Sequence, residues 1–250
     1  MCTIIVAFDR WPGTKLLVAA NRDERLGRPA EPPAIRTHRG RTILSPRDVE
    51  AGGTWVGLND AGVFVGITNR HDPAYFTRTA PVSRGTLVLD ALAASTAADA
   101  AAQAAGIDPT RVNPFHLVIG DRTSAHLLIG DGTTLTSRSL EPGVHVVTQS
   151  SFGAGDGIRH ARLEARLADL ADDAPPDWSV WRSELSHHDP AEPLTETCVH
   201  MPEAGYGTRS STYVRLGEDL GDVELLHAEG RPCVTAPQPL TEMLARLAPR

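Results

Sequence analysis

The chain has 250 residues, of which 41% are hydrophobic and 22% are charged, a composition typical of a folded globular protein. Its formal net charge is −7 and it has no basic stripe, which excludes a nucleic-acid backbone as the default partner. Because it has neither an apolar run near ~20 residues nor a cationic leader before an apolar segment, we expect no membrane span, no signal peptide and a cytoplasmic location.

The first third of the sequence predicts two β-hairpins. Each has two arms rich in β-branched, aliphatic or aromatic residues, separated by a turn that contains glycine. The four arms are residues 3–8, 15–20, 53–58 and 63–68. The first hairpin begins at Cys2 and turns at Trp11-Pro12-Gly13-Thr14, and the second turns at Asn59-Asp60-Ala61-Gly62.

Helices and strands come in separate groups along the rest of the chain. Ser83 is suited to cap the first helix, and Gly106 to end the second. The predicted ranges are helices 84–92 and 97–105, strands 115–120, 125–129, 133–137 and 144–148, a helix 158–170 extended by 178–185, strands 211–216 and 223–227, and a helix 240–247. This grouping predicts an α+β fold, with two mainly antiparallel sheets packed face to face between helical layers.

Cys2 is the first candidate for chemistry. Removal of Met1 would leave one residue with both a thiol and an α-amine. An α-amine titrates near ~7.7–8.0 and a thiol near ~8.5, so the amine is able to act as the general base for its own side chain. The alternative is that Cys2 is a small buried residue at the start of a strand.

The polar run Asn21-Arg22-Asp23-Glu24 ends the strand that pairs with the one starting at Cys2. Alternation places Asn21 and Asp23 on one face and Arg22 on the other. A carboxylate near the α-amine would orient it, and an amide would bind the substrate or an intermediate. The alternative is a salt-bridged loop formed with nearby arginines.

Asn69 ends the second arm of the second hairpin. A side-chain amide at a strand end suits an oxyanion hole, and its alternative role is to cap a turn.

The remaining thiols and imidazoles do not predict a metal site. The sequence has Cys198-Val199-His200 and His187-His188, but their spacing matches no usual zinc pattern. An odd number of well-separated cysteines, with Cys233 the third, does not indicate a disulfide framework either. We therefore expect no metal and no cofactor.

Four motifs occur in order along the chain. They are Met1-Cys2-Thr3-Ile4-Ile5-Val6, Ala20-Asn21-Arg22-Asp23-Glu24, Gly52-Gly53-Thr54-Trp55 with Leu58-Asn59, and Tyr206-Gly207-Thr208-Arg209-Ser210-Ser211-Thr212. Together they resemble the NRDE family, also called the transport and Golgi organisation protein 2 family. The resemblance implies an N-terminal nucleophile hydrolase-like four-layer αββα sandwich in one domain, residues 1–250, similar to cholylglycine hydrolases and penicillin V acylases.

The similarity to those acylases implies roles for individual residues. Cys2 matches the nucleophile, Asp23 matches the aspartate that orients the amine, and Asn69 resembles the oxyanion asparagine. A second active-site asparagine falls at Gln149, a longer amide.

Two arginines depart from the acylase pattern. The acylases place an arginine before the asparagine, whereas here Ala20 precedes Asn21 and the arginine is Arg22. Arg209 is a candidate for their late catalytic arginine, although the local alignment places Thr212 nearer that position.

These residues support an acyl-transfer hypothesis and a rival to it. In the first, Cys2 attacks an amide or thioester of a small acyl substrate, with water or an amine as acceptor. In the rival, the fold carries haem or acyl-CoA without turnover, because eukaryotic members of the family are associated with haem movement and lipid metabolism. The candidate haem ligands would be Cys2, His200, Met201 and Cys233.

Overall fold

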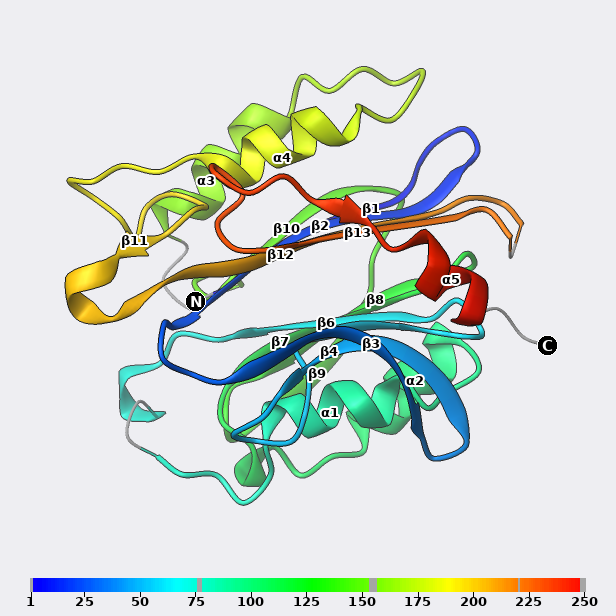
Figure 1. Ribbon diagram of the computed structural model, residues 1–250. Coiled ribbons are helices and arrows are strands. Elements are labelled where there is room, and N and C mark those ends of the chain that lie inside the picture. Colours follow the sequence, from blue (N-terminus) through cyan, green and yellow to red (C-terminus); the bar gives the residue numbers. More distant parts are fainter. Residues whose placement is uncertain (1, 76–77, 153–156, 220, 248–250) are drawn as a thin grey trace.

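The computed structural model describes residues 2–75, 78–152, 157–219 and 221–247. Within them lie two seven-stranded antiparallel sheets, packed face to face, with helices on both outer faces (Figure 1). The four-layer αββα sandwich predicted from the sequence is therefore confirmed. No helix in these ranges is long and apolar enough to cross a membrane.

The first sheet carries both the N-terminal strand and the late strands of the chain. Its order is β10-β1-β2-β12-β13-β14, with β11 paired to β12. The strands are β1 (Cys2–Trp11), β2 (Thr14–Arg25), β10 (Gly143–Thr148), β11 (His200–Met201), β12 (Tyr206–Leu216), β13 (Val223–Glu229) and β14 (Gln238–Pro239). The predicted hairpin is thus present, and it extends by five residues beyond the expected second arm.

The second sheet is a meander that follows the chain from β3 to β9. Its strands are β3 (Ala30–His38), β4 (Arg41–Asp48), β5 (Val56–Asn59), β6 (Phe64–Asn69), β7 (Phe115–Gly120), β8 (Ala125–Gly130) and β9 (Leu135–Ser139). β3 and β4 were not predicted. The other five fall on the expected runs within a few residues.

Five α-helices are described, and four of them form the two outer layers. They are α1 (Arg84–Ala91), α2 (Ala97–Ala105), α3 (Ile158–Leu167), α4 (Trp178–Ser186) and α5 (Thr241–Leu247). Ser83 caps α1 by accepting from the Gly85 N–H, as predicted. The expectation that 178–185 extends α3 is wrong, because α4 is a separate helix that starts after Pro175-Pro176.

Three hydrophobic clusters correspond to the three contacts between the four layers. Strand alternation sends Ile4 into the cluster between the sheets and Ile5 into the cluster under α3 and α4. The third cluster packs α1 and α2 against the second sheet. Each fully buried aliphatic or aromatic side chain contributes about 1.5–3 kcal/mol, so the position of the N-terminal strand is fixed from both faces.

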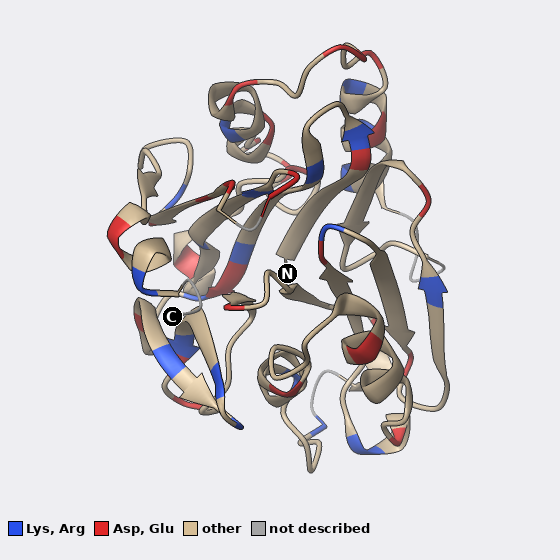
Figure 2. Ribbon diagram, turned by 90° about the vertical axis from the view of Figure 1, so that its right-hand side faces the viewer, with Lys and Arg blue, Asp and Glu red and all other residues tan. Residues whose placement is uncertain are grey.

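Charged residues are spread over helices, strands and loops of the molecule. In the view of Figure 2, basic and acidic residues mix along the ribbon and do not gather on one element.

Candidate functional site

Cys2 lies at the mouth of the space between the two sheets. It is the first residue of β1, and the antiparallel register places it directly opposite Arg22 on β2. Because directly opposed residues point to the same face, Cys2 and Arg22 share the face that looks toward the second sheet. Met1 lies outside the described residues.

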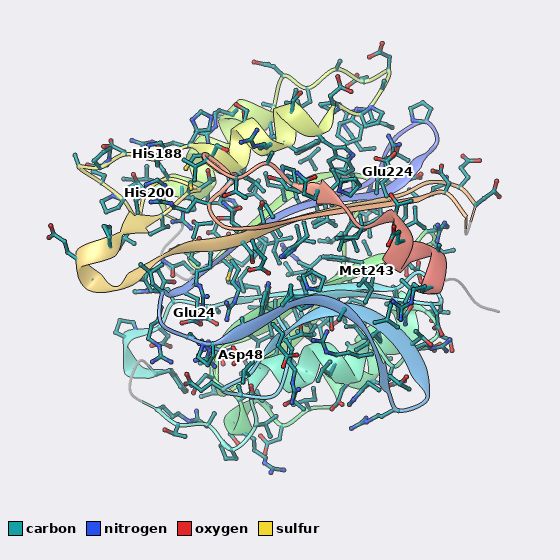
Figure 3. The ribbon with its side chains drawn as sticks, viewed as in Figure 1. Glu24, Asp48, His188, His200, Glu224 and Met243 are labelled. Atoms are coloured by element: carbon teal, nitrogen blue, oxygen red, sulfur yellow. The ribbon has the colours of Figure 1, made fainter. Side chains whose placement is uncertain are left out.

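A cavity of about 370 Å³ opens beside Cys2. Its lining is polar and includes four arginines and three acidic residues: Arg22, Arg28, Arg78, Arg84, Asp23, Glu24 and Asp48. Glu24 on the first sheet and Asp48 on the second lie at the same end of the sandwich (Figure 3). A larger cavity of about 480 Å³, beside α5, is lined by none of the predicted site residues.

Arg22 is fixed in this cavity by two neighbours, Trp55 and Asp48. Its guanidinium carbon lies 3.8 Å from the centre of the Trp55 ring, and its Nη2 lies 3.3 Å from Asp48 Oδ2. The same carboxylate accepts a 2.6 Å hydrogen bond from Arg28. Burial opposes the charge on Asp48, but the Arg28 bond and the Ala51 N–H keep its pKa below the ordinary value. Arg22 is therefore a fixed cation that is only 5% exposed.

A close contact between backbones brings Arg84 to the opposite wall. A Cβ on Gly53 would lie 2.4 Å from the carbonyl carbon of Gly85, so only glycine fits there. The contact seats the first turn of α1 on the segment before β5, where the Thr54 N–H donates to the Gly85 carbonyl. Arg84, the first residue of α1, thereby reaches the cavity, and it donates to the Pro114 carbonyl at 3.1 Å.

The charges of Arg22 and Arg84 and the ionisation of the Cys2 thiol influence one another. Burial lowers the pKa of Arg22 and of Arg84, and the charge of the Cys2 thiolate opposes this shift in both. Burial likewise raises the pKa of Cys2, and the Asp23 carboxylate raises it further, whereas the Asp23 backbone N–H and Arg22 act in the opposite direction. At neutral pH the side chain of Cys2 is a thiol, and a base must accept its proton before it can attack.

Asp23 approaches Cys2 from the next position along β2. Its side chain is fully buried; Oδ1 accepts a 2.5 Å hydrogen bond from Thr208, and Oδ2 lies 3.3 Å from Arg159 on α3. The Tyr206 hydroxyl donates to its backbone carbonyl at 3.0 Å. Asp23 is therefore held by the helical layer and by β12, while its backbone N–H faces the Cys2 sulfur.

Asn21 takes a different position from the one expected for a substrate-binding amide. Its Nδ2 donates to the carbonyls of Leu185 and Thr197, at 2.8 and 2.9 Å. The side chain is buried, and it does not line the 370 Å³ cavity. Asn21 thus ties β2 to the end of α4 and to the chain before β11.

Of the other predicted residues, Asn69 lines the cavity and Gln149 and Arg209 do not. Asn69 ends β6, on the wall formed by the second sheet. The Gln149 carbonyl accepts from the His71 N–H at 2.7 Å, which makes it a neighbour of the strand end. Arg209 is the unpaired residue of a bulge in β12, and its guanidinium donates to the carbonyl of Arg28.

Three residues in or beside the site were not predicted from the sequence: Asp48, Arg84 and Arg159. Asp48 and Arg84 belong to the second sheet and to the helix that covers it, and Arg159 to the helical layer above the first sheet. No local pattern marks them, because each reaches the site through packing between layers. The one usable signal was Trp55 in its glycine-rich motif, since an aromatic ring is a frequent partner for arginine.

The four candidate haem ligands do not converge. Cys2 lies in the cavity, whereas His200 and Cys233 lie together, with the Cys233 sulfur 3.4 Å from His200 Nε2. Axial ligands occupy opposite faces of a haem, so these two adjacent atoms are able to supply one axial position at most. Met201 follows His200 on β11, and both line a pocket that is separate from the Cys2 cavity.

Comparison with known proteins gives both a family and a fold. The model of the family described as Transport and Golgi organisation 2 matches residues 1–227. The human Transport and Golgi organization protein 2 homolog is 26% identical over 255 residues, covering 88% of this chain and 90% of its own.

Two solved structures share the fold. A Caenorhabditis elegans N-acylethanolamine-hydrolyzing acid amidase ortholog superposes with a TM-score of 0.61 at 15% identity, over 88% of this chain and 94% of its own. A conjugated bile acid hydrolase from Clostridium perfringens superposes with a TM-score of 0.52 at 12% identity, over 97% and 93%.

Proposed function

The chain belongs to the Transport and Golgi organisation 2 family, and we propose that it is an acyl-transfer enzyme whose nucleophile is Cys2 after removal of Met1. The observation that carries the proposal is the position of Cys2, on the first residue of a buried strand and at the wall of a polar cavity. The fold it shares with an amidase and a bile acid hydrolase supports this reading.

In the proposed reaction the α-amine of Cys2 accepts the thiol proton. The amine is the base of choice because burial raises the pKa of the thiol, whereas an α-amine titrates near ~7.7–8.0. The proposed role of Asp23, whose carboxylate is held by Thr208 and Arg159, is to orient that amine. The sulfur then bonds to the acyl carbon, and the amine proton passes to the departing nitrogen or sulfur.

The tetrahedral intermediate places negative charge on the former carbonyl oxygen. Asn69 supplies a side-chain amide from the wall opposite Cys2, and backbone N–H groups supply the rest of the oxyanion hole. Arg22 adds a fixed positive charge on the same face as the sulfur. Attack by water on the acyl-enzyme completes a hydrolase cycle, and attack by an amine completes an acyltransferase cycle.

The cavity lining favours an acyl donor that carries an anionic group. Arg28 and Arg22 share the Asp48 carboxylate, whereas Arg84 donates to a carbonyl and has no carboxylate partner among its described contacts. Guanidinium groups bind phosphate and carboxylate with paired hydrogen bonds. The class that fits is an amide or thioester of an acidic compound, with acyl-CoA as the thioester to test first.

The first experiment combines intact mass with turnover of an amide and thioester panel. We expect the mass of a chain without Met1, and Cys2→Ala is expected to abolish turnover while the circular dichroism spectrum is retained. Arg84→Gln is expected to raise KM for anionic donors by about tenfold, the equivalent of one charged hydrogen bond. Arg215→Gln is the matched control, because Arg215 pairs with Glu224 and does not line this cavity.

Retained Met1, or full turnover by Cys2→Ala, would refute the proposal. The carrier hypothesis gives a different result in the same experiment: saturable binding of acyl-CoA or haemin that is unchanged in Cys2→Ala, and no turnover of any donor by the native protein.

A further inference from the structure

Two cysteines and two histidines lie together outside the Cys2 cavity. Cys198 precedes β11 and His200 is its first residue, whereas Cys233 comes from the turn after β13 and His188 from the chain after α4. The ligand atoms of His188, His200 and Cys233 lie within 4.8 Å of one another. The two histidines are at the same end of the molecule, beside β11 (Figure 3).

Distances within this cluster match the edges of a metal tetrahedron. The two sulfurs are 3.7 Å apart, and His200 Nε2 is 3.3 Å from the sulfur of Cys198 and 3.4 Å from that of Cys233. Tetrahedral zinc, with Zn–S near ~2.3 Å and Zn–N near ~2.0 Å, requires S–S edges of about 3.8 Å and S–N edges of about 3.5 Å. Three atoms from two separate segments of the chain are therefore already spaced as ligands.

His188 is the candidate for the fourth ligand, because its ligand atom lies within 4.8 Å of those of His200 and Cys233. Its Nδ1 donates to the Ser186 carbonyl at 3.2 Å, which leaves the lone pair on Nε2. A backbone acceptor on the second ring nitrogen is the usual way in which a ligating imidazole is oriented. Its ring stacks on that of His200, with centroids 4.4 Å apart and planes 3° from parallel. Because an imidazole holds a metal in its own plane, one of the two rings must turn before both bind the same ion.

We propose that Cys198, His200, Cys233 and His188 form a structural zinc site. Two thiolates and two imidazoles are a donor set that selects zinc over hard cations such as Mg²⁺. On binding, each thiol loses its proton to the solvent and the metal replaces the Nε2 proton of His200. The Nδ1 of His200 then carries the ring proton, so Arg231, whose Nη1 lies 3.2 Å from it, turns away.

A metal at this site would stabilise the segment around Cys198, which contacts the candidate catalytic centre. Cys198 stands between Thr197, whose carbonyl accepts from Asn21, and Val199, whose N–H donates to Thr208. Thr208 in turn donates to the carboxylate of Asp23. A metal bound at Cys198 would hold the segment that fixes two residues of the Asn-Arg-Asp-Glu run, although zinc binding itself does not depend on catalysis by Cys2.

Cobalt and zinc titrations of the full-length, reduced protein test the proposal. We expect Co²⁺ to produce sulfur-to-cobalt charge-transfer bands and intense tetrahedral d–d bands, to saturate at one ion per chain, and to be displaced by Zn²⁺. Cys198→Ser and Cys233→Ser are expected to lose these bands, and Cys2→Ala to retain them. For the fourth ligand, His188→Gln is expected to weaken binding, and its neighbour His187→Gln, which lies near Glu184, is the control.

Circular dichroism of each variant shows whether loss of the cobalt bands reflects loss of the site or loss of the fold. Native protein refolded in the presence of a chelator provides metal-free protein for the same titrations. The proposal is overturned if the reduced native protein shows no charge-transfer bands, or if the bands survive in folded Cys198→Ser and Cys233→Ser. It is also overturned if chelated, reduced protein takes up no zinc and the two cysteines only form a disulfide on oxidation.

Discussion

His116 provides a quantitative test of the packing beside Asn69. It lies on β7, opposite Thr68, with its side chain fully buried and Nδ1 3.2 Å from the Thr68 hydroxyl. Burial, with a contribution from the positive charge of Arg70, lowers its pKa from 6.5 to about 3. The histidine is therefore neutral in the folded protein at pH values well above about 3.

The effect on stability follows from proton linkage. Between the folded pKa of about 3 and the unfolded value of 6.5, the unfolded chain binds one more proton, so stability is lost as pH falls through this window. Integration gives a loss of about 2.7 kcal/mol between pH of about 7.5 and about 4.5 from this one residue. The contribution is fully present above the unfolded pKa, at neutral pH.

Urea unfolding followed by tryptophan fluorescence measures the effect across this pH range. His116→Asn keeps a polar atom near the Nδ1 position but does not titrate. When the pH is lowered from about 7.5 to about 4.5, the variant should therefore lose about 2–3 kcal/mol less of its free energy of unfolding than the native protein loses. His145→Asn, at a histidine that is not fully buried, is the control. Parallel pH profiles for His116→Asn and native protein would refute the reasoning.

Three further predictions concern the strands around the cavity. Asn21→Ala removes two buried hydrogen bonds and should cost about 2 kcal/mol in urea unfolding; an unchanged midpoint would contradict this. Gly53→Ala should cost about 1–3 kcal/mol through its clash with Gly85, whereas Gly27→Ala, with open space around it, should change stability by less than about 0.5 kcal/mol. The rate of Cys2 alkylation should rise with pH to a higher midpoint than in a peptide of the same sequence; equal midpoints would exclude the effect of burial on its pKa.

Local signals were sufficient to predict most of the fold. The Cys2 hairpin followed from a tight turn between two apolar runs, and its register alone brings Cys2 opposite Arg22. β3 was missed because Pro32 and Pro33 argue against a strand. The structure accommodates them at the edge of the second sheet, where a bulge lies between Glu31 and Ala34.

The site was predictable only to the extent that it lies on the first sheet. Cys2 and Arg22 meet within one hairpin. Asp48 and Arg84 reach the cavity through packing between layers, and such packing produces no periodic pattern of residues that could be recognised in the sequence. The proximity of Cys198 to Cys233 was not predicted, for the same reason. The pairing of β12 with β13 returns the chain to bring Cys233 beside Cys198, across 35 positions.

The two sheets contribute different walls to the cavity. Cys2, Arg22 and Asp23 belong to the first sheet, while the wall from Thr54 to Trp55 and the segment from Arg78 to Gly85 belong to the second sheet and its helix. Insertions or substitutions in that second wall change what enters without disturbing the hairpin that holds the sulfur. If Cys2 is the nucleophile proposed above, the compound that enters the cavity is able to change while the reacting residue stays in place.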